Sequence, residues 1–474
     1  MAKPTAGAAG AAVLVLVLVG WMAACGPSRV ELTLEQPWTA HTLDLYVVLS
    51  RPGPVSAWCV RDADPTEVHR VASPAVEREH HLRLAGLIAA ERYTCVAEAE
   101  DGGSGTAALQ TDELVEGLPE LVIEPGASGG SGGESEVDYV VANVGACTPS
   151  TSQRLVVFDR DGEIRWVARA GSAIGPAVSF EPHGDHVTFG GGWLPNPAGR
   201  LQQMDWFGEP VLDAANVLSD ATDALFHHEA RELDDGRFLT IERVPIVPEA
   251  GPSFFGFRIR RFAADGTVDF DYHGQRALDE GHLPAGEGNA WHANWADVTT
   301  LDGRETLLVS LCFLQRIVAI DLETGDWRWT LSAEGDLEID SDAVPECQHG
   351  VQADGSTLLV YDNGLEREAS RIIELELDEQ AGTATEVWRW TEEGWFEPTF
   401  GSVQRMPGGH VLVGRGHNAC FAERDDVSQI IEVDPGTGER VWTARFPDDA
   451  LTFFRALPAD GCGVFANERF CPPG

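Results

Sequence analysis

Positively charged residues are scarce in this chain of 474 residues, which holds 33 Lys and Arg against 76 Asp and Glu. The formal net charge is −43, and such a surface repels the phosphate backbone of nucleic acids. Nucleic acid is therefore not expected as a partner. An anionic ligand would need a local cationic pocket to bind against this field.

Long apolar runs are missing beyond the N-terminus, so no transmembrane segment is expected there. Residues 11–20 form a short apolar run with Lys3 as the only preceding charge, and Met22-Ala23-Ala24-Cys25 follows. This pattern is typical of a signal peptide. Because a Cys after small residues resembles the lipobox of bacterial lipoproteins, we expect residues 1–25 to be a lipoprotein signal peptide that is lipidated at Cys25. An ordinary cleaved signal peptide is the alternative.

The nine cysteines include no Cys-x-x-Cys pair and no Cys/His spacing of a zinc site, so the sequence predicts no structural metal. Setting Cys25 aside leaves eight, an even number that fits disulfides in an exported protein. We expect Cys59 to pair with Cys95, and Cys462 with Cys471. The pairing of the other four is left open: Cys147, Cys312, Cys347 and Cys420.

Residues 26–125 alternate apolar and polar side chains, as strands do. Their Leu-x-Gly-Leu and Tyr-x-Cys patterns, at residues 84–95, resemble the end of a fibronectin-III or immunoglobulin-like sandwich. A Gly/Ser-rich segment at residues 126–137 is typical of a flexible linker. The sequence thus predicts a small β-sandwich, a linker and a second domain over residues 138–474.

The second domain repeats one pattern six times: an apolar run, an Asp, a Gly turn and an aromatic or large apolar residue. Each copy predicts a β-hairpin. A spacing of about 45–60 residues with several short strands per repeat is typical of a β-propeller. We therefore expect an all-β chain with a six-bladed propeller. The aspartates of the six copies are Asp159, Asp205, Asp265, Asp321, Asp378 and Asp434.

Three histidines recur in phase with these repeats. His228, His292 and His349 each stand where the innermost strand of a blade should begin, 64 and 57 residues apart. We therefore expect their side chains to meet at one mouth of the ring. Convergent imidazoles can ligate a metal, or they can supply a nucleophile, an acid/base and a charge stabiliser for group transfer.

The segments around these histidines resemble the bacterial arylsulfate sulfotransferases. The resemblance covers most of residues 138–446, and three segments carry it. These are His227-His228-Glu229 through Gly236, Trp291-His292-Ala293-Asn294, and Gln348-His349 through Tyr361-Asp362-Asn363-Gly364.

This resemblance implies a six-bladed propeller at the bacterial envelope that moves sulfate from a phenolic sulfate ester to a phenol. It implies no cofactor and no nucleotide sulfate donor. His349 would be the nucleophile that carries the sulfate. His228 and His292 would stabilise the sulfuryl oxygens or shuttle a proton, with Asn294 as a hydrogen-bond donor. His227 and Arg371 are further candidates for substrate contact.

One position departs from the family pattern. Cys312 stands where the family has an Arg that contacts the sulfate, and losing such a clamp costs about 2–4 kcal/mol of transition-state binding. A catalytically lapsed propeller that binds a ligand or partner at the envelope is therefore the rival hypothesis. A metal- or quinone-dependent propeller enzyme is a third. The natural donor and acceptor and the oligomeric state are left open.

The lipid anchor can be tested apart from any activity. A Cys25→Ser variant lacks the thiol that acylation requires, so the full-length protein should move from the membrane fraction to the soluble fraction on cell fractionation. A variant that stays with the membranes would contradict the lipobox assignment.

Overall fold

The structure is a computed structural model that describes residues 26–36, 39–114, 118–126, 135–146, 154–168, 179–190, 201–213, 225–416, 428–447, 451–460 and 464–465. Several sequence predictions fall outside these ranges: the signal peptide with Cys25, most of the linker, and four other cysteines. Those cysteines are Cys147, Cys420, Cys462 and Cys471.

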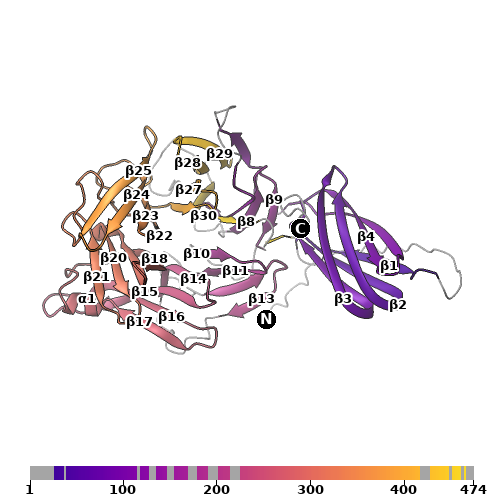
Figure 1. Ribbon diagram of the computed structural model, residues 1–474, viewed down its shortest axis with the longest axis horizontal. Coiled ribbons are helices and arrows are strands. Elements are labelled where there is room, and N and C mark those ends of the chain that lie inside the picture. Colours follow the sequence, from indigo (N-terminus) through magenta and orange to yellow (C-terminus); the bar gives the residue numbers. More distant parts are fainter. Residues whose placement is uncertain are drawn as a thin grey trace, which may run out of the picture.

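The described part of the second domain forms six antiparallel sheets, each with four propeller strands, arranged around a ring (Figure 1). Five of these sheets are built from four strands that are consecutive in the chain. The first three in chain order are β10 (Ser179–Pro182), β11 (His186–Gly190), β12 (Gln202–Asp205) and β13 (Pro210–Asp213); β14 (Leu225–Glu232), β15 (Phe238–Ile246), β16 (Phe254–Phe262) and β17 (Val268–His273); β18 (Ala293–Leu301), β19 (Arg304–Leu311), β20 (Arg316–Asp321) and β21 (Trp327–Leu331).

The next two sheets complete the run of consecutive strands, and the predicted six-bladed propeller is confirmed. They are β22 (Gly350–Asp354), β23 (Thr357–Asp362), β24 (Arg371–Asp378) and β25 (Thr383–Trp390); β26 (Ser402–Arg405), β27 (Val411–Arg415), β28 (Gln429–Asp434) and β29 (Glu439–Arg445). One short helix, α1 (Gln275–Asp279), follows β17. Among the described residues, no helix is long and apolar enough to cross a membrane.

The repeated Asp/Gly turns have the predicted role. In the first copy, Asp159 Oδ1 accepts hydrogen bonds from the backbone N–H groups of Asp161 and Glu163, both at 3.0 Å. The turn glycine adopts a positive φ in all six copies, a conformation that strains any residue with a Cβ. These glycines are Gly162, Gly208, Gly266, Gly325, Gly382 and Gly438.

The sixth sheet closes the ring with the end of the propeller sequence. It has the order β30-β7-β8-β9. The C-terminal β30 (Leu451–Ala459) pairs antiparallel with β7 (Tyr139–Ala146), which begins the propeller and continues into β8 (Arg154–Asp159) and β9 (Ile164–Val167). The residues around Phe453 therefore supply the closing strand.

The N-terminal domain is a small β domain with its own apolar core. Its strands are β1 (Val30–Glu35), β2 (Thr42–Arg61), β3 (Asp64–Ala85), β4 (Arg92–Ala99) and β5 (Ser104–Gln110). The predicted Cys59–Cys95 disulfide is confirmed. It joins directly opposed residues of the neighbouring strands β2 and β4, so it does not bridge two facing sheets. The immunoglobulin or fibronectin-III assignment stays a prediction.

The change from one domain to the other comes before the predicted linker. Residues Val122–Pro125 form β6, which pairs with β29 as a fifth strand of that propeller sheet. The segment that follows the N-terminal domain is thus anchored to the propeller by the pairing of β6 with β29.

A buried ionic network also joins the domains. Arg165 of β9 is fully buried and binds Asp159 at 2.6 Å and Glu67 of β3. Its guanidinium also donates to the carbonyl oxygen of Gly86 at 3.3 Å. A Cβ at Gly86 would lie 2.6 Å from the ring of Phe465, so the two domains approach too closely there for a side chain.

Removing this arginine should loosen the domain interface. An Arg165→Ala change removes the buried cation that pairs with both Asp159 and Glu67, and we expect it to lower the free energy of unfolding by about 3–5 kcal/mol. Arg258, whose pair with Asp271 lies near the surface, is the matched control and should cost about 1 kcal/mol or less when changed to Ala. Urea unfolding followed by tryptophan fluorescence measures both, and equal losses would contradict the role of Arg165.

Candidate functional site

The three in-phase histidines lie at the starts of three neighbouring inner strands. His228 belongs to β14, and His292 and His349 directly precede β18 and β22. His228 and His292 have φ values of 62° and 43°, and Cys347 has 50°. Such left-handed conformations are uncommon outside glycine and cluster at functional sites, where surrounding structure holds them.

The structure brings these imidazoles together. The Nε2 atoms of His228 and His292 lie 3.3 Å apart. The ring centroids of His228 and His349 are 6.1 Å apart. All three side chains share one cavity, so the convergence expected from the repeat spacing is what the structure shows.

Hydrogen bonds fix the orientation of His349. Its Nδ1–H donates to Oδ1 of Asn363 at 2.8 Å. The amide of Asn363 cannot turn around, because its Nδ2 donates to the carbonyl oxygens of Glu397 at 2.6 Å and Phe400 at 2.9 Å. The proton on His349 therefore sits on Nδ1, and Nε2 keeps its lone pair. Sequence reasoning cited Asn363 only as part of a motif and missed this positioning contact.

Burial keeps these imidazoles neutral. Desolvation lowers the pKa of His349 to about 4, against weaker opposing hydrogen bonds from Asn363 and the carbonyl of Cys347. It also holds the pKa of His228 and of His292 well below the usual value, and the neighbouring histidines push in the same direction. At neutral pH the cluster is uncharged and offers basic nitrogen lone pairs.

The cavity combines these imidazoles with an apolar wall. Its volume is about 190 Å³. The rings of Phe400 and Phe454 lie 4.8 Å apart, and Phe313, which is 54% exposed, stacks on His292 at 4.5 Å. Such a lining suits an aromatic ligand that carries one small polar group. The lining residues are His228, His292, Cys312, Phe313, Cys347, His349, Pro398, Thr399, Phe400 and Phe454.

Cys312, the position at which the sequence departs from the family pattern, forms a disulfide. Cys312, which begins a 3-10 turn after β19, is bonded to Cys347, and both line the cavity. The sequence left this pairing open. The bond ties the turn between β19 and β20 to the segment that leads into His349. Among the described residues that line the cavity, none is Arg or Lys.

Sequence reasoning missed a buried cation near the cluster. Arg455 of β30 is buried, and its charge acts on both His228 and His349. It pairs with buried Glu229 and lies over the ring of Trp295 at 4.3 Å. Its place in the closing strand, next to Phe454, was the available signal.

The other predicted site residues lie around the cavity or outside it. Asn294 is buried and accepts a hydrogen bond from Ser310 at 2.8 Å, while its Nδ2 has no hydrogen-bond partner among the described residues. His227 packs behind His292, with ring centroids 5.1 Å apart. The structure does not bring Arg371 to the cavity, because Asp362 and two backbone carbonyls hold its guanidinium.

A metal at this cluster was the other hypothesis. Ring nitrogens of His227, His228 and His292 lie within 4.8 Å of one another, which satisfies the spacing of a ligand set. No carboxylate of the described residues joins that group. A cation there would therefore lack an anionic ligand.

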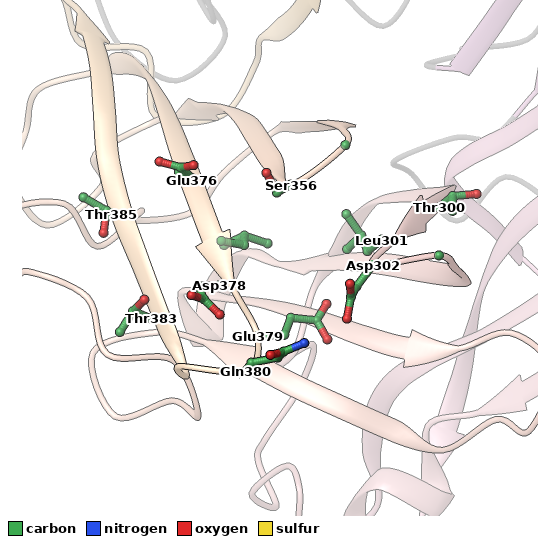
Figure 2. A pocket seen from close by; sticks show the side chains of 13 residues that line it. Thr300, Leu301, Asp302, Ser356, Glu376, Asp378, Glu379, Gln380, Thr383 and Thr385 are labelled. Carbon is green, nitrogen blue, oxygen red and sulfur yellow. The ribbon is translucent and has the colours of Figure 1, made fainter.

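A larger hollow elsewhere on the propeller has the opposite character. Figure 2 shows its lining, in which Asp302, Glu376, Asp378 and Glu379 present carboxylates. It includes the turn after β18, at the strand end away from His292. Its negative walls disfavour a sulfate ester, so the imidazole cavity is the candidate site.

Comparison with solved structures gives distant likenesses only. Dihydro-heme d1 dehydrogenase NirN is 13% identical, with 91% of this chain and 83% of that chain covered and a TM-score of 0.34. Kuenenia stuttgartiensis hydrazine synthase is 11% identical over 59% and 68%, also at 0.34. Citrobacter koseri AztD is 10% identical over 86% and 99%, at 0.28. These scores support no argument about function.

Comparison with protein families gives a definite result. No curated protein matches the chain. The sequence profile of the arylsulfotransferase (ASST) family matches residues 139–455, which is most of the chain and contains every histidine of the cavity. The chain therefore belongs to the arylsulfotransferase family.

Proposed function

We propose that the protein transfers the sulfuryl group of a phenolic sulfate ester to a phenolic acceptor through a sulfate bound to His349. The observation that carries this proposal is the fixed tautomer of His349. Its Nδ1–H is held by Asn363, so the Nε2 lone pair is available beside two further imidazoles in an apolar cavity.

The first half-reaction begins with attack by this lone pair. His349 Nε2 forms a bond to sulfur while the bond from sulfur to the phenolic oxygen breaks. Binding of the anionic ester raises the pKa of the His228–His292 pair, which takes up a proton from solvent and then gives it to the departing phenolate. In the second half-reaction an acceptor phenol gives its proton to that pair, its oxygen attacks sulfur, and the N–S bond breaks to regenerate His349.

The imidazoles would stabilise the negative charge of the sulfuryl group by direct contact. His228 and His292 become hydrogen-bond donors once they take up a proton, and an anion in the cavity raises the pKa of each imidazole. Arg455 adds a fixed positive charge whose field is reduced by Glu229. This arrangement supports transfer without an arginine at position 312.

The apolar wall supports the choice of an aryl substrate. Phe313, Phe400 and Phe454 can cover the faces of one aromatic ring while the imidazoles contact its sulfate. Exposed Phe313 stands at the entrance. A small aliphatic sulfate would leave this surface without contact.

A catalytically lapsed binding propeller is the second candidate. One observation favours it, namely that no Arg or Lys is found among the described residues that line the cavity. Such a protein would hold an aromatic ligand and release no product.

We further propose that the chain acts at the bacterial envelope after export. The N-terminal pattern of an apolar run followed by Cys25 supports a lipid anchor. Two disulfides among the described residues support an oxidising compartment. Phenolic sulfates and phenols would reach the enzyme there as free small molecules.

An assay with 4-nitrophenyl sulfate and phenol tests the enzymatic proposal. The wild-type protein should release nitrophenolate only when phenol is present, and a brief incubation with the donor alone should leave one sulfate on His349, detected by mass spectrometry. His349→Ala should lower turnover at least ~10³-fold, and His228→Ala or His292→Ala about 10²–10³-fold.

His282→Ala is the control variant, because it removes a histidine that lies outside the cavity. His282 stacks on Trp327 at the surface, so its loss should leave turnover unchanged. Absence of nitrophenolate and of sulfated histidine in a folded wild-type protein would reject the transferase proposal and favour the binding propeller.

The pH dependence of kcat/KM reports the state of His349 in the free protein. The imidazole attacks only when neutral, and its pKa is lowered to about 4, so activity is present above that pH and is lost as the pH falls through it. We expect the acidic limb near pH 4. A limb near 6.5, the usual histidine pKa, would show that the nucleophile is not the buried His349.

A further inference from the structure

A second cluster of metal-type ligands lies away from the imidazole cavity. Glu232 ends β14, four residues after His228, which corresponds to about 13 Å along a strand. His183 and His186 flank the tight turn between β10 and β11, where the N–H of His183 donates to the carbonyl oxygen of His186 at 2.8 Å. The turn of one blade thus faces the inner strand of the next.

Three potential ligand atoms converge at this point. One atom each of His183, His186 and Glu232 lies within 4.8 Å of the others. His186 Nε2 is 2.9 Å and His183 Nε2 is 3.3 Å from Glu232 Oε2. Ligands at about 2.0–2.1 Å from a tetrahedral zinc ion stand about 3.3 Å from one another. The His183–Glu232 separation equals that spacing, and the His186–Glu232 separation lies slightly below it.

The other nitrogen of His186 is held as it is in metal sites. His186 Nδ1 lies 2.7 Å from Oδ1 of Asp185. Metal-bound histidines commonly donate this second N–H to a carboxylate, which fixes the tautomer and the ring. Asp185 is almost fully exposed, so this contact is not forced by packing.

Hydrogen bonding pairs both ring nitrogens of His186 with carboxylates only if its imidazole is doubly protonated. With its proton on Nδ1, neutral His186 turns a lone pair from Nε2 toward the carboxylate of Glu232, and two acceptors repel each other. His183 Nε2 is buried and has no hydrogen-bond partner among the described residues. A cation between the three groups would satisfy both nitrogens and the carboxylate at once.

The surrounding polar groups also converge on the same oxygen. Glu232 Oε2 accepts from Thr188 at 2.7 Å and from the amide of Gln203. Gln203 Nε2 also lies 3.1 Å from His186 Nε2, and a half-turn of this amide would offer its oxygen as a fourth ligand.

We propose that His183, His186 and Glu232 form a binding site for a divalent transition metal, with zinc as the ion that the two imidazoles and one carboxylate suit best. The site joins the turn after β10 to the end of β14, so a bound ion links two neighbouring blades. The proposal does not depend on the sulfuryl-transfer proposal, because none of its ligands lines the imidazole cavity.

Zinc titration of the chelator-treated, full-length protein tests this site. Competition with a chromophoric chelator gives the affinity, and elemental analysis gives the stoichiometry. The wild type should bind one zinc ion per chain at this site and unfold at a higher temperature with zinc than without it. Glu232→Gln and His183→Asn should each lower the affinity by at least ~100-fold and abolish the thermal shift.

Three further variants separate the site from its alternatives. Asp185→Asn, at an exposed position that folding does not require, should weaken zinc binding about 10–100-fold. His410→Asn removes another histidine that pairs with a glutamate, Glu432 at 2.6 Å, and should leave binding unchanged. His292→Ala should also leave it unchanged, since that residue belongs to the imidazole cavity.

The proposal fails if the wild type binds no zinc. In that case the contact of His186 with Glu232 is an imidazolium–carboxylate pair. It fails equally if Glu232→Gln and Asp185→Asn bind zinc as the wild type does, or if His292→Ala alone removes the ion, which would place the metal at the imidazole cluster.

Discussion

The antiparallel pairing of β30 with β7 is the contact on which the rest of the structure depends. It closes the ring with strands from opposite ends of the propeller, because β30 completes the sheet of β7, β8 and β9 as its fourth strand. Because the ring is closed, the inner strands begin at a common mouth, and His228, His292 and His349 meet there. The same strand delivers Phe454 to the cavity wall and Arg455 to the buried interior.

The site differs in its electrostatics from one built around a fixed arginine. Cys312 and Cys347 form a bond across the cavity wall, which stiffens the segment before His349 but contributes no charge. The nearby charge of Arg455 is shared with Glu229. In the proposed mechanism, an anion in this cavity would therefore be stabilised mainly by imidazoles that gain protons as it binds, while desolvation keeps His349 neutral beforehand.

Two groups of buried or half-buried ionic residues connect separate sheets of the structure. Arg165 holds the N-terminal domain through Glu67 while it braces the turn at Asp159. The cluster of His183, His186 and Glu232 occupies a comparable place between two blades. Both depend on residues distant in sequence, and both place polar groups where two sheets meet.

The repeats determined a large part of this protein from the sequence alone: six blades, the turn role of Asp159 and Gly162, and the phase of the three histidines. Local patterns suffice there, because turn geometry and strand alternation are set by neighbouring residues. Only the tertiary structure decided the Cys312–Cys347 bond, the tautomer imposed on His349 by Asn363, and the placement of Arg455 within range of His228 while Arg371 stays outside the cavity. These depend on how far each blade turns relative to the next, which follows from packing between sheets and leaves no periodic trace in the sequence.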